Sequence, residues 1–128
     1  MSAQSVLKME NLYFDEIKYN RDISVDIDEE YQYRFERNIN QTDSSHYIVS
    51  LKCFIKTSNN ESVNLEIRVT GWFCCDEKDE NTRDTLIRKN AVAIIFPYLR
   101  SQISLVTTQP NMCPIMLPTM NINALFDD

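Results

Sequence analysis

The feature that most constrains the fold is the alternation of apolar and polar side chains over residues 63–75. Leu65 and Ile67 alternate there with Glu66 and Arg68, and the pattern continues to the end of the segment. Successive side chains of a β-strand point to opposite faces, so a period of two predicts a strand with one buried face. Such a strand must belong to a sheet whose apolar face is covered by another layer.

Three earlier segments show the same period and are predicted to be strands: residues 12–22, 31–40 and 47–57. The period slips once in the first of them, which indicates a β-bulge. Residues 58–61, Ser-Asn-Asn-Glu, supply turn chemistry before the last strand. Consecutive strands joined by short turns favour an antiparallel meander.

A single long helix is predicted to follow the sheet. The acidic stretch 76–80 ends the strand pattern, and Asn81 or Thr82 can cap a helix that runs to about Val106. Apolar residues recur in it at the spacing of three and four that a buried face requires. Pro97 lies inside the helix, where it removes a backbone hydrogen bond and is expected to cause a kink one turn earlier.

The fold class predicted from these segments is α+β, a four-stranded antiparallel β-meander packed with one long kinked helix. With 128 residues and 43% hydrophobic composition, the chain is expected to form one domain over residues 1–128. The helix is apolar almost all round in its middle, which predicts a partner subunit against its outer side. The alternative is that the irregular apolar segment after Pro110 folds over that side.

Charge and composition disfavour several classes of function. The 19 acidic and 13 basic residues give a net charge of −6, which argues against a nucleic-acid partner. The single glycine argues against glycine-rich phosphate and dinucleotide sites, so no cofactor is predicted. No apolar run approaches the roughly 20 residues of a membrane span, and the N-terminal residues lack the pattern of a signal peptide. We therefore expect a cytoplasmic protein without membrane insertion.

Catalytic and metal-binding residues are not predicted. The four cysteines lack C-x-x-C spacing, and the only histidine, His46, has no cysteine near it in sequence, so no zinc signature exists. An exposed turn histidine is favoured over a catalytic base. Cys74 and Cys75 are adjacent, but strand alternation sends their side chains to opposite faces, which favours structural burial over a redox role. The chain is not predicted to be an enzyme.

Aromatic and methionine side chains exceed what one small core can bury, and they are candidates for a groove that binds other polypeptides. Thioethers repack around different partners, and aromatic rings provide a large contact area at low entropic cost. The alternative is that these residues belong to the core. The candidates are Tyr31, Tyr33, Phe35, Phe54, Trp72, Met116 and Phe126, with Met112 and Met120 beside them.

Several motifs in this order are similar to those of the SecB export chaperones. The strongest lie in the carboxy-terminal third, where the order and the spacing both fit the helix and the closing segment of that family. The motifs are RDISV at 21–25, GWF at 71–73, IFPYLR at 95–100 followed by IS at 103–104, and LPTMNINALF at 117–126.

The resemblance implies a homotetramer, a dimer of dimers built through helix and sheet contacts. It also implies that extended, unfolded clients lie in grooves lined by aromatic side chains, with no nucleotide or metal involved. The sequence ends two residues after Phe126, whereas SecB proteins continue into a second helix and an acidic tail that help dock the translocation motor, so contact with that motor is left open. The residues expected between subunits are Leu65, Ile67, Val69, Ile94, Ile95 and Leu99.

Three functions are compatible with the sequence. The first is a SecB-like holdase that binds unfolded or extended polypeptides, including preproteins for export. The second is a dedicated chaperone of an antitoxin in a toxin–antitoxin–chaperone module. The third, from another class, is a small α+β ligand-binding domain, which an isolated monomer with a closed apolar pocket would favour.

Overall fold

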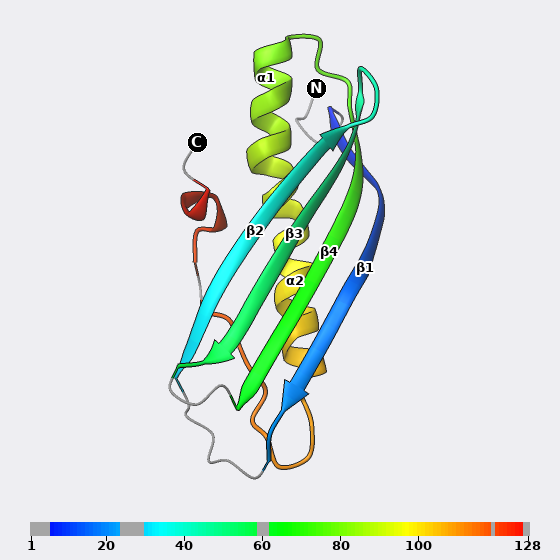
Figure 1. Ribbon diagram of the computed structural model, residues 1–128. Helices are drawn as coiled ribbons and strands as arrows, with labels where there is room; N and C mark the ends of the chain where they lie inside the picture. The colour runs from blue at the N-terminus through cyan, green and yellow to red at the C-terminus, as the bar shows by residue number, and fades with distance from the viewer. Residues whose placement is uncertain (1–5, 24–29, 59–61, 119, 127–128) are drawn as a thin grey trace.

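Four long strands form one antiparallel sheet, and a long helix lies on one of its faces (Figure 1). The structure is a computed structural model that describes residues 6–23, 30–58, 62–118 and 120–126. The predicted turn residues 59–61, and the motif residues Ser24, Val25 and Thr119, lie outside the described part. The strands are β1 (Leu7–Arg21), β2 (Tyr31–Gln41), β3 (His46–Thr57) and β4 (Val63–Cys75).

The strand order in the sheet is β1-β4-β3-β2. The four-stranded antiparallel sheet with one long helix is therefore confirmed, and β2, β3 and β4 follow the meander order. The first strand differs from a simple meander because β1 pairs with β4 and not with β2. Residues 22–30, which connect β1 to β2, are numerous enough to span three interstrand spacings, about 14 Å.

β1 carries two register shifts, one between Met9 and Asn11 and one between Phe14 and Glu16. The predicted bulge is thus present, together with a second one, and the strand begins five residues earlier than the alternation indicated. Each bulge adds a residue on β1 without a partner on β4, so the side-chain period shifts along the strand. This explains why the alternation in this segment is less regular than in β4.

The helical region begins with α1 (Glu80–Thr85), continues as a π-helical segment η2 (Leu86–Ala91) and ends as α2 (Val92–Val106). The N-cap is Asp79, and not Asn81 or Thr82, because the Asp79 carboxylate accepts hydrogen bonds from the Thr82 backbone N–H at 3.0 Å and from the Thr82 hydroxyl at 2.6 Å. The departure from α-helical geometry lies in η2, before the position that Pro97 predicted.

The core lies between the helix and the facing side of the sheet. Val69 and Phe73 of β4 are fully buried there, as are Ile95 and Leu99 of α2. Gly71 permits this close packing: a Cβ atom at that position would lie 2.7 Å from Phe73 Cε1 and 3.1 Å from Ile95 Cγ2. The single glycine of the chain is therefore placed where the helix and a buried ring approach the strand most tightly.

The segment after α2 packs back onto the core. Ile115, Leu117 and Ile122 are buried, the last at the start of the short 3₁₀ helix η3 (Ile122–Leu125). The Ser104 hydroxyl donates to the Ile115 carbonyl at 3.0 Å, and the Thr107 hydroxyl oxygen accepts from the Ile115 N–H at 2.7 Å. The segment thus covers part of the helix, as the alternative interpretation held, but leaves its outer side open.

Candidate functional site

The outer side of α2 is an exposed surface without charge. Ile94, Tyr98 and Leu105 are 37%, 47% and 65% exposed, and Arg100 is the only charged residue of this helix. Large apolar side chains in that arrangement indicate a contact surface for another polypeptide. We call this surface the outer stripe; it consists of Ala93, Ile94, Pro97, Tyr98, Ser101 and Leu105.

A hollow of about 370 Å³ lies along the edge of the outer stripe, between α2 and the C-terminal segment. Met116, which is 72% exposed, and Arg100 lie at this hollow, and Phe96 contributes an almost fully buried ring. A flexible thioether beside an aromatic ring can adapt to different apolar side chains. We call it the methionine hollow; it is lined by Phe96, Pro97, Arg100, Ser101, Ser104 and Met116.

The residues predicted to lie between subunits are mostly inside the subunit. Ile95 and Leu99 are fully buried against the sheet, and the three β4 residues of the set, Leu65, Ile67 and Val69, are fully buried beneath the helix. Their side chains are fully enclosed in the core of the subunit, so in this conformation they do not reach the surface where a partner subunit would lie. Ile94 alone among the six presents substantial area to solvent.

The aromatic residues predicted on β2 are half-buried on the helix side of the sheet. Tyr31, Tyr33 and Phe35 pack against the core, and the Phe35 ring meets the Phe96 ring edge-on with centroids 6.2 Å apart. Desolvation raises the pKa of both tyrosine hydroxyls. These rings therefore stabilise the edge of the core and leave only part of their surface for a client.

Phe126 is also half-buried and packs against the core. The Arg37 guanidinium lies over its ring, 4.9 Å from the centroid, in a cation–π arrangement. This contact joins the C-terminal segment to the edge strand β2. Phe126, which is predicted to bind clients, thus holds the C-terminal segment against β2 in the described structure.

Phe54 and Trp72 lie on the opposite side of the sheet, which we call the open face because no helix of the described chain covers it (Figure 1). Both rings have partners there. The Arg34 guanidinium is 3.8 Å and the Lys52 ammonium 4.7 Å from the Phe54 ring centroid. Trp72, 45% exposed, donates from Nε1 to the Tyr13 hydroxyl at 3.1 Å.

A second hollow, of about 800 Å³, surrounds Phe54 at the end of the open face. It receives two of the predicted client residues, Tyr33 and Phe54, but its other side chains are mainly polar or charged. A small-molecule site is usually a closed pocket lined by apolar side chains, and this hollow lacks such a lining. The lining residues are Gln32, Tyr33, Arg34, Phe54, Ile55, Lys56, Asn64 and Glu66.

Ion pairs run across the middle of the open face. Lys52 lies between two carboxylates, with its Nζ 2.5 Å from Glu16 Oε1 and 3.2 Å from Glu66 Oε1. Hydrogen bonding to Lys52 is the main cause that lowers the pKa of Glu16. Beside this group, Asp15 accepts from Arg68 Nε at 2.9 Å and from the Thr70 hydroxyl at 3.0 Å.

The thiols of the chain are free. Cys75 is buried on the helix side and Cys74 is half-buried on the open face, as strand alternation predicted. Burial raises the pKa of the Cys53 thiol to about 12, so this cysteine is an inert part of the core.

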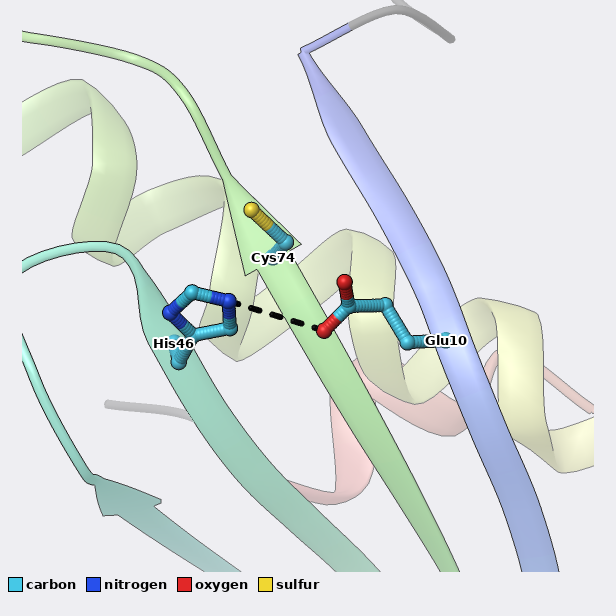
Figure 2. A group of neighbouring side chains, drawn as sticks. All are labelled: Glu10, His46 and Cys74. Atoms are coloured by element: carbon cyan, nitrogen blue, oxygen red, sulfur yellow. Dashed lines mark ion pairs between the residues drawn. The ribbon is translucent and has the colours of Figure 1, made fainter.

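One group of metal-ligating side chains escaped the sequence analysis. Glu10, His46 and Cys74 lie together on the open face, with their ligand atoms all within 4.8 Å of one another (Figure 2). The three residues are far apart in sequence, and the only signal that joins them is the strand register, in which His46 is the direct partner of Cys74. That register becomes visible only in the folded sheet.

Comparison with known proteins gives consistent results. The sequence profile of the family described as "Preprotein translocase subunit SecB" matches residues 2–128. The protein-export protein SecB of Magnetococcus marinus is 25% identical over 123 residues, which are 94% of this chain and 78% of that protein. The SecB of Acinetobacter baumannii is 26% identical over 121 residues, with 85% and 80% covered.

An archaeal relative, the uncharacterized protein MJ0357 of Methanocaldococcus jannaschii, is 30% identical over 103 residues. The match covers 78% of this chain and 63% of that protein, so the chain spans less than two thirds of this relative. None of the helices in the described residues has the length and apolar character needed to cross a membrane.

Among solved structures, the fold is similar to the Mycobacterium tuberculosis Rv1957 SecB-like chaperone, solved in complex with a ChAD peptide from the Rv1956 HigA1 antitoxin. The TM-score is 0.72 at 12% identity, with 91% of each chain covered, so this likeness concerns the fold. The resemblance inferred from the motifs is confirmed, and with it the chaperone class of function. The family profile matches nearly the whole length of the chain, which therefore belongs to the SecB family.

Proposed function

We propose that this chain is a holdase, which binds unfolded or extended polypeptide segments and keeps them from aggregating without catalysing a reaction on them. The observation that carries the proposal is the uncharged outer stripe of α2 with the methionine hollow at its edge. A family of chaperones needs such an apolar surface, whereas an isolated globular domain rarely leaves one bare. Preproteins for export are one class of client compatible with it.

The methionine hollow suits a client better than the aromatic residues of the open face. Of the seven predicted client residues, only Met116 and Trp72 are exposed, at 72% and 45%, and the neighbours of Met116, Phe96 and Pro97, are apolar. Trp72 and Phe54, in contrast, already have partners within the subunit. An extended segment placing one apolar side chain in the hollow would contact Met116 and Phe96 together.

The outer stripe is proposed to be covered by a second copy in a homotetramer. Its exposed residues are continuous along α2, and covering them removes the largest apolar area of the helix from water. Replacing Leu105 by Glu should then lower the native mass measured by light scattering to that of a smaller species. Asn40→Glu, which adds the same charge at an exposed position of β2, should leave the native mass unchanged. An unchanged mass for Leu105→Glu would exclude this part of the proposal.

The holdase proposal is tested by aggregation of a denatured model client in the presence of the chain. Stoichiometric amounts should suppress light scattering, and Met116→Glu should weaken suppression by about tenfold if one buried apolar contact of roughly 1.5 kcal/mol is lost. Asn40→Glu again serves as the matched control, since it should retain full suppression. Absence of suppression by the unmodified chain across several unrelated clients would reject a general holdase.

The site of client binding can be located separately because Trp72 is the only tryptophan of the chain and lies on the open face. A tryptophan-free client bound in the methionine hollow should leave the Trp72 emission unchanged. A Trp72→Phe, Met116→Trp variant should instead show a blue shift of its emission when the client is added. The reverse pattern would place the client on the open face.

A dedicated antitoxin chaperone is the second candidate, and one observation favours it. The SecB-like chaperone of M. tuberculosis, whose fold is similar, was solved with a peptide from an antitoxin. Under this alternative the chain would have one main client, and it would protect that client from proteolysis while failing to suppress aggregation of unrelated proteins. Pull-down from the native cell with mass spectrometry separates one client from many.

We further propose that the protein works in the cytoplasm without a cofactor and without nucleic acid as a partner. The absence of enzymatic activity is part of the same proposal, since SecB-family proteins act by binding. The net charge of −6 supports the exclusion of nucleic acid, because phosphate binding requires a basic surface. A ligand-binding domain of another class is not favoured, since most of the residues that line the larger hollow are polar or charged.

A further inference from the structure

Three side chains that are common metal ligands meet at one end of the open face. Glu10 belongs to β1, Cys74 to β4 and His46 to β3, and these three strands are adjacent in the sheet. Figure 2 shows the three side chains on the same side of the strands, with the imidazole and the carboxylate directed toward each other. His46 Nε2 lies 3.6 Å from Glu10 Oε1, and the ligand atoms of all three residues lie within 4.8 Å of one another.

These separations are close to those of a tetrahedral zinc site. Zinc bonds of about 2.0–2.3 Å place neighbouring ligand atoms about 3.3–3.8 Å apart. The imidazole and the carboxylate already have such a separation, and the thiol must approach by at most about 1.5 Å, which a change of side-chain torsion can supply.

His46 is held in the orientation that metal binding requires. Its Nδ1 lies 2.8 and 3.0 Å from the two carboxylate oxygens of Asp43, and its Nε2 faces Glu10. Asp43 is itself fixed, because its Oδ1 accepts hydrogen bonds from the backbone N–H groups of Ser45 and His46, each at 2.9 Å. A carboxylate that accepts the Nδ1 proton leaves the Nε2 lone pair free for a metal.

The charge around the cluster favours a cation. Asp76 Oδ1 lies 3.7 Å from Cys74 Sγ, so three carboxylates surround the thiol and the imidazole. Burial and the neighbouring Asp76 and Glu10 raise the pKa of Cys74, and the hydrogen bond that His46 Nδ1 donates to Asp43 raises the pKa of His46. Lys8, the register partner of Cys74, is the nearest basic neighbour along β1 and is exposed.

We propose that Glu10, His46 and Cys74 form a binding site for a divalent transition-metal ion, most suitably zinc, with Asp43 as the positioning residue for the histidine. Thiolate, imidazole and carboxylate together match the borderline-soft character of zinc and distinguish the site from the all-oxygen sites of calcium and magnesium. A water molecule or Asp76 would complete the coordination. Binding displaces the thiol proton of Cys74 into solvent, so affinity should increase with pH.

Such an ion would fasten β1, β4 and β3 to one another at the end of the sheet where β3 begins. The site lies on the open face, on the other side of the sheet from α2, and is separate from the outer stripe and the methionine hollow. The inference therefore does not depend on the holdase proposal, and its test needs no client.

The test is a titration of the full chain with cobalt(II), which reports tetrahedral coordination through visible d–d bands and a thiolate ligand through a near-ultraviolet charge-transfer band. The unmodified chain should show both, and added zinc should displace the cobalt. Cys74→Ser should abolish the charge-transfer band, while Cys113→Ser, at the exposed cysteine of the C-terminal segment, should retain it. Circular dichroism of each variant verifies that the sheet is intact.

His46→Gln and Glu10→Gln should each weaken cobalt binding by at least tenfold. Asp43→Asn should weaken it by about 10- to 100-fold but leave both bands in place at saturating cobalt, because it acts through His46 and not as a ligand. Lys8→Met should tighten binding. Equal spectra for the unmodified chain and Cys74→Ser, or loss of the charge-transfer band in Cys113→Ser instead, would overturn the assignment.

Discussion

The outer stripe of α2 and the open face of the sheet both expose large side chains, but their surroundings differ. On the open face, Trp72 donates a hydrogen bond to Tyr13, and Phe54 lies under two cationic groups. On the outer stripe, Tyr98 and Leu105 project from a helix with a single charged residue. Exposure alone is therefore a poor guide to a binding surface.

The comparison shows that the partners of a ring carry more information than its exposed fraction. Trp72 and Tyr98 are almost equally exposed, at 45% and 47%. Trp72 belongs to a surface with many ion pairs and hydrogen bonds. Tyr98 belongs to an uncharged surface from which contact with another polypeptide would remove apolar area from water. Four predictions can break or sharpen this distinction.

The largest difference in stability is expected between substitutions on the buried side and on the exposed side of α2. Leu99→Ala removes a fully buried side chain and should lower the free energy of unfolding by about 2–5 kcal/mol. Leu105→Ala, on the outer stripe, should change it by no more than about 0.5 kcal/mol at protein concentrations where the chain is monomeric. Urea denaturation measures both, and comparable losses would mean that the outer stripe is also part of the subunit core.

The second largest difference in stability is expected between substitutions on the helix-facing side and on the open-face side of β4. Gly71→Ala adds a methyl group toward the helix, where it meets the fully buried Phe73 ring at 2.7 Å, and should cost about 1–3 kcal/mol of stability. Asn64→Ala alters an exposed position of the same strand toward the open face and should cost much less. A neutral Gly71→Ala would show that the helix does not press on the sheet at this point.

A smaller effect is expected from the ion pairs of the open face. The Glu16 pKa lies below its ordinary value of 4.5 because of hydrogen bonding to Lys52 and Lys18. The stabilisation by this carboxylate is therefore present above its unfolded pKa and is lost as the pH falls through the lowered folded value. Lys52→Met should make stability less dependent on pH below about 4.5, as followed by urea denaturation from pH 6 to pH 3. An equal acid dependence in both proteins would remove Lys52 as the cause.

The smallest effect is expected from the Trp72–Tyr13 contact. Tyr13→Phe removes the hydroxyl that accepts from Trp72 Nε1 but keeps the ring, and an exposed hydrogen bond of this kind contributes about 0.5 kcal/mol or less. Thermal denaturation should show a shift close to the experimental error. A large loss of stability would mean that the open face is held together by its aromatic residues more than by its ion pairs.

The sequence predicted the strands well wherever a half-buried face produces a strict alternation. β2, β3 and β4 begin and end within one residue of the expected bounds. The position of β1 beside β4 was not predictable in this way, because the alternation of a strand says which face is buried but not which strand is its neighbour. The N-cap prediction was wrong because Asp79, Asn81 and Thr82 are all residue types that cap helices, and the sequence alone does not distinguish between them.

The candidate site was predicted less well, for two physical reasons. A helix that is apolar on several sides does not reveal which side faces its own sheet: Ile95 and Leu99, which the sequence predicts at a subunit interface, are fully buried within the subunit. Aromatic residues at alternate positions of β2 face the helix, so replacing Tyr33 or Phe35 by alanine is expected to destabilise the core as well as any client contact. The metal cluster required the register of three strands.

The two hydrogen bonds between α2 and its C-cap and the C-terminal segment bear on how the proposed client site could adapt to a client. Ile115 and Leu117 are buried on either side of Met116, and Ile115 is tied at both its N–H and its carbonyl by hydroxyls of Thr107 and Ser104. The backbone that presents Met116 is therefore held by contacts within the subunit. If a client binds in the methionine hollow, as proposed, Met116 would adapt to it by side-chain rotations on the picosecond-to-nanosecond scale, without the opening of a loop.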